Sequence, residues 1–228
     1  MIAHHGGTEG TEINKHPALG YVAPFAVFLA FLAIKGWAPA EIEYPLRVVA
    51  VTAMLLLFSR RLLPWRAHKW AGSAALGIVV FVIWIAPDML WPGYREHWLF
   101  SNAVTGRAAG TAPQDSLVFL VFRIAGTALL VPIIEELFWR AWLMRYLVSP
   151  KFLEVPLGTF TALSFWISAA LFASEHGPYW DVGLLAGIAY NWWMIRTRSL
   201  ADCILAHAVT NACLAAYVLT AGHWQYWL

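Results

Sequence analysis

Long apolar runs recur along this chain, and they restrict its fold more than any other feature of the sequence. We predict seven membrane spans, within a range of six to eight, at residues 18–34, 46–58, 71–86, 117–148, 157–174, 182–195 and 200–219. A backbone surrounded by hydrocarbon has to satisfy its own hydrogen bonds, so the spans should be helices and not isolated strands. The sequence therefore predicts an all-α fold, a polytopic bundle of transmembrane helices.

Composition supports this class and excludes others. Hydrophobic residues make up 61% of the 228 positions and charged residues 12%, whereas soluble domains carry roughly 45–50% and about 25%. The net charge of +2 is small and no basic block occurs, so we expect no nucleic-acid partner. We divide the chain into a tail (1–17), spans with an external loop (18–116), a helical core that carries the functional site (117–220) and a second tail (221–228).

Basic residues gather in alternate connections between the predicted spans. They follow the second span, follow the core of the fourth and precede the seventh: Arg60, Arg61, Arg66 and Lys69; Arg140, Arg145 and Lys151; Arg196 and Arg198. The positive-inside rule places these connections in the cytoplasm. We expect an integral membrane protein with its N-terminus in the cytoplasm.

The fourth span contains charges that a membrane helix should avoid. Glu135, Glu136 and Arg140 lie in an otherwise apolar stretch, although one charge at the bilayer centre costs about 2.5–3.5 kcal/mol or more. Glu136 and Arg140 are four residues apart on one helix face, so they can form an ion pair. Glu135 is rotated by about 100° from Glu136 and is less easily neutralised, as suits a general base. A purely structural charge cluster is the alternative interpretation.

The fifth and seventh spans carry the remaining candidates. Phe172 and His176 share a helix face just before a Gly-Pro pair that ends the helix. His207 and Asn211 are four residues apart on the seventh span, and two donors on one buried face could stabilise an oxyanion. Each pair alone is compatible with ordinary helix ends and packing. Together, the three spans supply a carboxylate, two imidazoles and an amide.

These motifs resemble the CAAX-processing and bacteriocin-processing family of intramembrane proteases, which includes the type II CAAX prenyl endopeptidases. Glu-Glu-x-x-x-Arg, Phe-x-x-x-His and His-x-x-x-Asn occur here in that order, within residues 117–219. Among relatives, the chain is similar to bacterial CAAX protease-related proteins that accompany exosortase-type sorting systems. The resemblance implies a glutamic-type endopeptidase in which Glu135 and His176 activate water, and His207 and Asn211 stabilise the oxyanion. Glu136, Arg140 and Phe172 would support the site, with no cofactor and with a membrane-associated or C-terminal CAAX-like peptide as substrate.

Three other functions remain open. The chain could be a zinc-dependent membrane protease with Glu135, His176 and His207 as ligands, although no His-Glu-x-x-His helix is present. It could be a proton-coupled transporter, although no inverted repeat is visible. It could also be a scaffold that binds a membrane partner without cleaving it.

Overall fold

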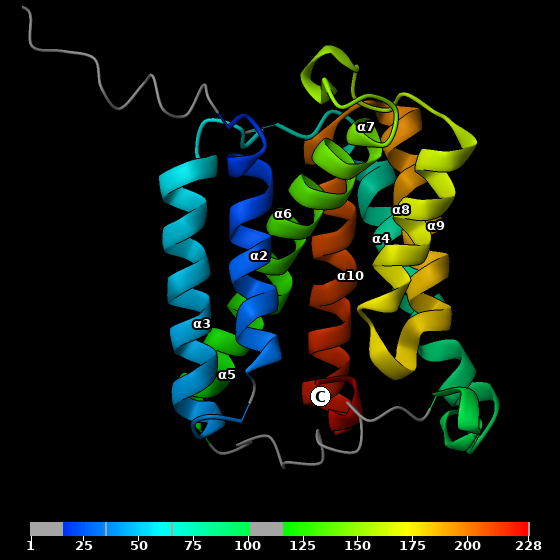
Figure 1. The fold of residues 1–228 in the computed structure, drawn as a ribbon. Coiled ribbons are helices and arrows are strands. Elements are labelled where there is room, and N and C mark those ends of the chain that lie inside the picture. Colours follow the sequence, from blue (N-terminus) through cyan, green and yellow to red (C-terminus); the bar gives the residue numbers. More distant parts are fainter. Residues whose placement is uncertain (1–15, 35, 65, 101–115, 228) are drawn as a thin grey trace, which may run out of the picture.

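Seven helical passages run the length of the protein, as the apolar runs predict (Figure 1). The computed structural model describes residues 16–34, 36–64, 66–100 and 116–227. The passages are α2 (Leu19–Ala33), α3 (Ala40–Met54) with η1 (Leu55–Ser59), α4 (Trp70–Leu90), one long helix over 117–146, α8 (Ala162–Ser174), α9 (Trp180–Thr197) and α10 (Leu200–Ala221). Four of them are long and apolar enough to cross a membrane. The described residues contain no strand, which confirms the all-α prediction.

The long fourth passage is one helix with two wide π-helical turns. It consists of α5 (Leu117–Ala125), η5 (Gly126–Leu130), α6 (Val131–Glu136), η6 (Leu137–Leu143) and α7 (Met144–Tyr146). π-Helical turns are rare and often accompany functional sites, because they displace side chains from the regular helical spacing. Here they lie on either side of the six residues that end in Glu135 and Glu136.

Five short 3-10 helices lie in the described connections: η2 (Tyr94–Glu96), η3 (Trp98–Phe100), η7 (Phe152–Glu154), η8 (Gly177–Tyr179) and η9 (Trp224–Trp227). The predicted tail lies outside the described residues over positions 1–15, and so does the predicted external loop over 101–115. The segment η9 packs against α10 in a small apolar cluster that includes Ala215, Val218 and Trp227.

Two helix starts differ from the prediction. The second passage begins at Ala40 and not at residue 46, because the acidic Glu43 is accommodated inside the helix by an ion pair with Arg47 at 2.7 Å. The fifth begins at Ala162 and not at residue 157. Gly158 there adopts a positive φ of 75°, which a continuous helix does not allow, and the hydroxyl of Thr161 accepts a hydrogen bond from the Ser164 amide as an N-cap.

Helix α10 lies at the centre of the bundle, in contact with α4, the long helix and α9 (Figure 1). Helices α8 and α9 form the other closely packed pair. A Cβ atom added to Gly187 of α9 would lie 3.2 Å from the Ala169 Cα and the Phe172 ring of α8. The absence of a side chain at Gly187 therefore allows α9 to approach the helix that positions Phe172 and His176.

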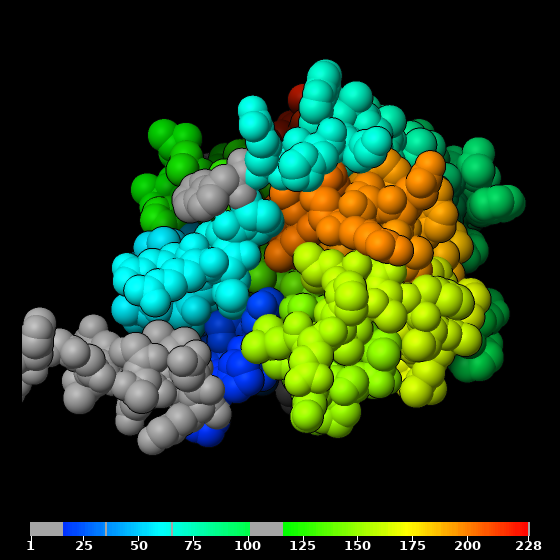
Figure 2. All heavy atoms as spheres, turned by 90° about the horizontal axis from the view of Figure 1, so that it is seen from above, coloured from blue at the N-terminus to red at the C-terminus, as the bar shows by residue number. Residues whose placement is uncertain are grey.

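The two ends of the bundle differ in charge. The connections 60–69, 147–161 and 198–199 lie together at the upper end in Figure 1, which Figure 2 shows from above. Of the described residues there, six are basic: Arg60, Arg61, Arg66, Lys69, Lys151 and Arg198. Arg196 lies next to them in the last turn of α9. The connections at the opposite end include η8, η9 and residues 91–100, in which the described basic residue is Arg95. We call these the basic end and the opposite end.

Candidate active site

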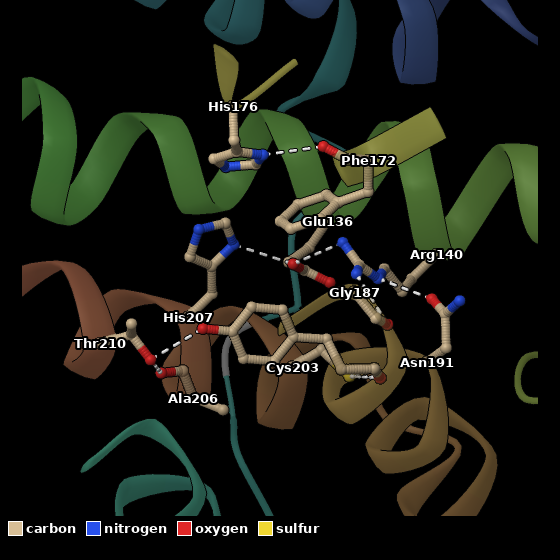
Figure 3. Close-up of polar contacts among 11 residues, drawn as sticks. Glu136, Arg140, Phe172, His176, Gly187, Asn191, Cys203, Ala206, His207 and Thr210 are labelled. Carbon is tan, nitrogen blue, oxygen red and sulfur yellow. Dashed lines mark hydrogen bonds and ion pairs between the residues drawn. The ribbon is translucent and has the colours of Figure 1, made fainter. Parts of the chain in front are cut away.

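Glu136 links the long helix to α10. Its side chain is fully buried, and its Oε1 atom accepts hydrogen bonds from Arg140 Nη1 at 3.1 Å and from His207 Nδ1 at 2.9 Å (Figure 3). The predicted ion pair between Glu136 and Arg140 is therefore present. The contact with His207 adds a second partner that spacing within one helix does not show. One carboxylate thus fixes a cation on its own helix and an imidazole on another.

Arg140 is also held from α9. Its Nε donates to Asn191 Oδ1 at 3.1 Å and its Nη2 to the Gly187 carbonyl at 3.4 Å. The guanidinium carbon lies 4.5 Å from the centre of the Phe172 ring. Because the charge, the hydrogen-bond donors and the flat face of Arg140 all have partners, this fully buried cation is well compensated.

Glu135 differs from its neighbour in lacking such partners. It is 6% exposed, and its Oε2 atom is buried without a hydrogen bond to any described residue. A buried carboxylate oxygen requires a donor, and one without a protein partner calls for a specific explanation. Glu135 lines a cavity, so a water molecule or a substrate group in that cavity could supply the donor.

His176 presents its second ring nitrogen to the same cavity. Its Nδ1 lies 2.8 Å from the Phe172 carbonyl oxygen, which can only accept, so Nδ1 carries the hydrogen (Figure 3). In the neutral ring Nε2 then has a free lone pair. The ring packs against Phe172 and Trp84, with centroids at 4.6 and 5.2 Å, which fixes its plane.

His207 and Asn211, the two candidate residues of α10, each use part of their side chain in a hydrogen bond to another passage. Because His207 uses Nδ1 to bond Glu136, Nε2 is the nitrogen left for the cavity. Asn211 donates one amide hydrogen to the Thr127 carbonyl at 2.9 Å and retains a second. Thr127 belongs to the wide turn η5, in which i→i+5 hydrogen bonds replace the usual α-helical pattern.

A cavity of about 150 Å³ joins these groups, although they come from three passages. Glu135, His176, His207 and Asn211 all line it, so the four predicted catalytic residues converge. The fully buried Glu136 and Arg140 lie behind the cavity wall and hold the lining in place. The geometry therefore unites residues separated by up to 76 positions in one partly polar cavity.

Other polar residues of the site were not identified from the sequence. Tyr190 and Thr210 line the cavity and are joined by a hydrogen bond of 2.7 Å, while Asn191 binds Arg140 behind it. All three are polar residues inside apolar helices, and that signal could have revealed them. Arg123 also lines the cavity and donates to the Trp227 carbonyl at 2.7 Å.

The opposite end of the site is tied together by a surface network. Arg95 bonds to Asp88 and to Asp181, and it donates to the Pro178 carbonyl next to the His176 turn. Burial raises the pKa of Tyr226, with a further contribution from the adjacent Asp88, so the phenol stays protonated and donates to that carboxylate. This network supports the turn that carries His176.

The same groups include the three residues predicted as alternative zinc ligands, Glu135, His176 and His207. Among the described residues, no three His, Cys, Asp or Glu side chains are close enough together to hold a metal ion. His207 Nδ1 and His176 Nδ1 are both occupied by hydrogen bonds, so each histidine would have to bind through Nε2. Ligation by Glu135, His176 and His207 would therefore require these three side chains to move closer to one another.

The comparisons with known proteins agree with the motifs. Residues 117–213 match the family described as type II CAAX prenyl endopeptidase, Rce1-like. The matched region begins with the long helix and ends two residues after Asn211, so it contains every predicted site residue. No curated protein and no solved structure matches the chain.

Proposed function

We propose that this integral membrane protein, whose residues 117–213 belong to the type II CAAX prenyl endopeptidase family, hydrolyses a peptide bond with a water molecule activated by Glu135 and His176. The observation that carries the proposal is the combination of an unpartnered Glu135 oxygen and a free His176 Nε2 in one cavity. Glu136 also has one buried oxygen without a partner, but its other oxygen accepts two hydrogen bonds, whereas no described residue is hydrogen-bonded to Glu135. A base that binds water needs a carboxylate that is free in this way.

The proposed first step uses both groups on one water molecule. Glu135 takes one proton of the water while His176 Nε2 accepts a hydrogen bond from the other hydrogen, which directs the oxygen lone pair at the peptide carbonyl. The new C–O bond places negative charge on the carbonyl oxygen. Glu135 then passes its proton to the amide nitrogen, the C–N bond breaks, and the products are a carboxylic acid and an amine.

We assign the oxyanion to His207 and Asn211. The second amide hydrogen of Asn211 is free to donate. His207 Nε2 can donate only in the imidazolium form, because Nδ1 is already the donor to Glu136. The Glu136 carboxylate lies 2.9 Å from Nδ1 and fixes the direction of the ring, and preorganised donors are often the largest contribution to catalysis. Glu136 therefore acts as a positioning residue for His207.

We further propose that the N-terminus is cytoplasmic and that the membrane is a bacterial inner membrane. The support for the orientation is the charge difference between the ends, with six described basic residues in the connections of the basic end. The support for the membrane is the resemblance to bacterial relatives. A membrane-associated or C-terminal CAAX-like peptide is the substrate that the family suggests, and the matched residues 117–213 include Glu135, His176, His207 and Asn211.

The test is mass spectrometry of membrane peptides incubated with the protein in nanodiscs. We expect new C-termini with the wild-type chain and none with Glu135→Ala, while both proteins show the same thermal unfolding. Equal product formation by the two would refute the role of Glu135. Exhaustive chelation is the second arm, in which full loss of cleavage, restored by zinc, would replace the glutamic mechanism with a metal-dependent one.

A further inference from the structure

A second cavity lies at the basic end of the bundle, outside the site already described. Its volume is about 360 Å³, and it is lined by residues from several connections and helix ends: Tyr21, Leu62, Pro64, Arg66, His68, Ala141, Arg145, Leu157, Thr197, Arg198, Ser199 and Leu200. Figure 2 looks onto this end, where segments far apart in the sequence surround a hollow. None of the lining residues belongs to the proposed catalytic set.

The charge of this cavity has one sign. Three arginines and one histidine line it, and no carboxylate does. Within the described residues, none of Arg66, His68, Arg145 and Arg198 forms an ion pair. Asp202 lies in the first turn of α10 but is fully buried, and it accepts hydrogen bonds from the His68 and Lys69 backbone amides. Several uncompensated cations around one cavity favour an anion in it.

The cavity differs from a charged surface because one of its arginines, Arg145, is buried and held in place. It is only 8% exposed, its Nε donates to the Ala141 carbonyl, and its guanidinium lies 5.2 Å from the Phe152 ring. These contacts fix the guanidinium without neutralising its charge. Nη1 also donates to the Val155 carbonyl at 3.4 Å, so the hydrogens left for a ligand are the two on Nη2 and the second on Nη1. They are held in one plane, as suits the oxygens of a phosphate group.

The position of the cavity identifies the environment of its ligand. Tyr21 lies near the start of α2, Leu200 begins α10 and Thr197 ends α9. The cavity is thus at the level where spanning helices end, which in a bilayer is the level of the lipid headgroups. Basic cavities between helix ends on the cytoplasmic side are suited to anionic lipid headgroups.

We propose that this cavity binds a phosphate group, and that the group belongs to an anionic lipid of the surrounding leaflet. Arg145 would contact the phosphate from the inner wall, and Arg66 and Arg198 from the rim. The binding site is independent of peptide hydrolysis, so it stands or falls separately from the proposed protease function.

The experiment is a titration of the whole detergent-purified chain with short-chain phosphatidylglycerol, followed by native mass spectrometry. Detergent removes the general attraction of a charged bilayer surface. We expect one saturable lipid on the wild-type protein and much weaker binding of short-chain phosphatidylcholine, whose headgroup has no net negative charge.

Paired variants show whether the cavity is responsible. Arg66→Gln with Arg198→Gln removes two exposed rim charges and should weaken phosphatidylglycerol binding roughly 30-fold. Arg60→Gln with Arg61→Gln removes two exposed charges at the same end that do not line the cavity, and this pair should bind as wild type does. Equal loss in both pairs, or no loss in the first, would overturn the proposal.

A competition arm separates the two sources of phosphate. Inorganic phosphate or glycerol 3-phosphate, at the concentration of the bound lipid, should leave phosphatidylglycerol in place. Full displacement by either one would show that the cavity takes its phosphate from solution and would reject the lipid assignment. Arg66→Lys with Arg198→Lys should retain most of the binding, which checks that loss in the glutamine pair follows from charge.

Discussion

Two buried ion pairs of the same kind occur in this protein, and only one belongs to a candidate site. Glu43 and Arg47 of α3 pair at 2.7 Å, and Glu136 and Arg140 of the long helix pair at 3.1 Å, in both cases with the glutamate four residues before the arginine. The other oxygen of Glu43 accepts a hydrogen bond from the Gly36 amide at 3.1 Å. Glu136 also binds His207.

The difference lies in the surroundings of each pair. The α3 pair does not line the catalytic cavity, and Arg47 Nε is buried without a hydrogen-bond partner. The second pair adjoins Glu135, a carboxylate that faces the cavity and has an unpartnered oxygen. A buried Glu–Arg pair in a membrane helix is therefore not enough to identify a site. An unpaired acid beside it, in a cavity with imidazoles, is the stronger sign.

The largest effect should come from replacing the unpaired acid. Glu135→Gln keeps the size of the side chain but removes the proton acceptor, so we expect peptide cleavage to fall by roughly 10³-fold or more. The check is the initial rate of product formation in nanodiscs. Glu43→Gln is the matched control, and it should keep at least half of the wild-type rate. Comparable losses in the two variants would remove the distinction between the pairs.

Breaking the second pair should affect both stability and activity. Glu136→Gln leaves Arg140 without its counter-ion and should cost about 3–5 kcal/mol of stability. Adding Arg140→Met should recover part of that loss but none of the activity, because His207 still lacks its carboxylate. Thermal unfolding in detergent and cleavage rate together check this. Activity regained by the double variant would contradict the positioning role of Glu136.

The corresponding double replacement in α3 should have little effect on stability or on cleavage. Glu43→Leu with Arg47→Met removes both charges at once, and apolar replacement of a whole buried pair is often neutral or stabilising by about 1–4 kcal/mol. We expect an unchanged or higher unfolding temperature and an unchanged cleavage rate. A loss of cleavage here would show that α3 contributes to catalysis in a way that the geometry does not indicate.

A moderate effect should come from replacing Asn191, which accepts a hydrogen bond from Arg140. Asn191→Ala removes an acceptor from Arg140 and a donor from the Phe165 carbonyl, and each buried group left unpaired costs about 1–3 kcal/mol. The chain should unfold at a lower temperature and retain measurable cleavage, since Arg140 keeps Glu136. Complete loss of cleavage in a protein that still folds would move Asn191 into the group of essential residues.

The sequence was most informative about individual helices and the residues within them. The apolar runs predict all seven passages, and the four-residue spacing predicts the Glu136–Arg140 pair. Contacts between passages could not be read in this way. The bond from His207 to Glu136 depends on how two helices separated by 71 positions rotate against each other. The spacing of residues within one helix gives no information about the rotation of that helix against another.

The same limit explains the missed parts of the second passage. The prediction starts this passage at residue 46, after the acidic Glu41 and Glu43. In the structure Glu43 is buried by pairing with Arg47, which converts two unfavourable residues into a tolerated pair. Hydropathy sums residues one at a time and cannot represent this compensation.

The wide turn η5 has a consequence for how this helix can change over evolution. A π-helical turn contains one residue more than the α-helical turn it replaces. Losing one residue from 126–130 would restore a regular helix and rotate the preceding turns by about 100° relative to Glu135. The Thr127 carbonyl would then no longer meet Asn211. A lineage with such a deletion would keep its membrane span, yet it would need a different partner for that amide, so a single gap in an alignment at this point would mark a rebuilt site.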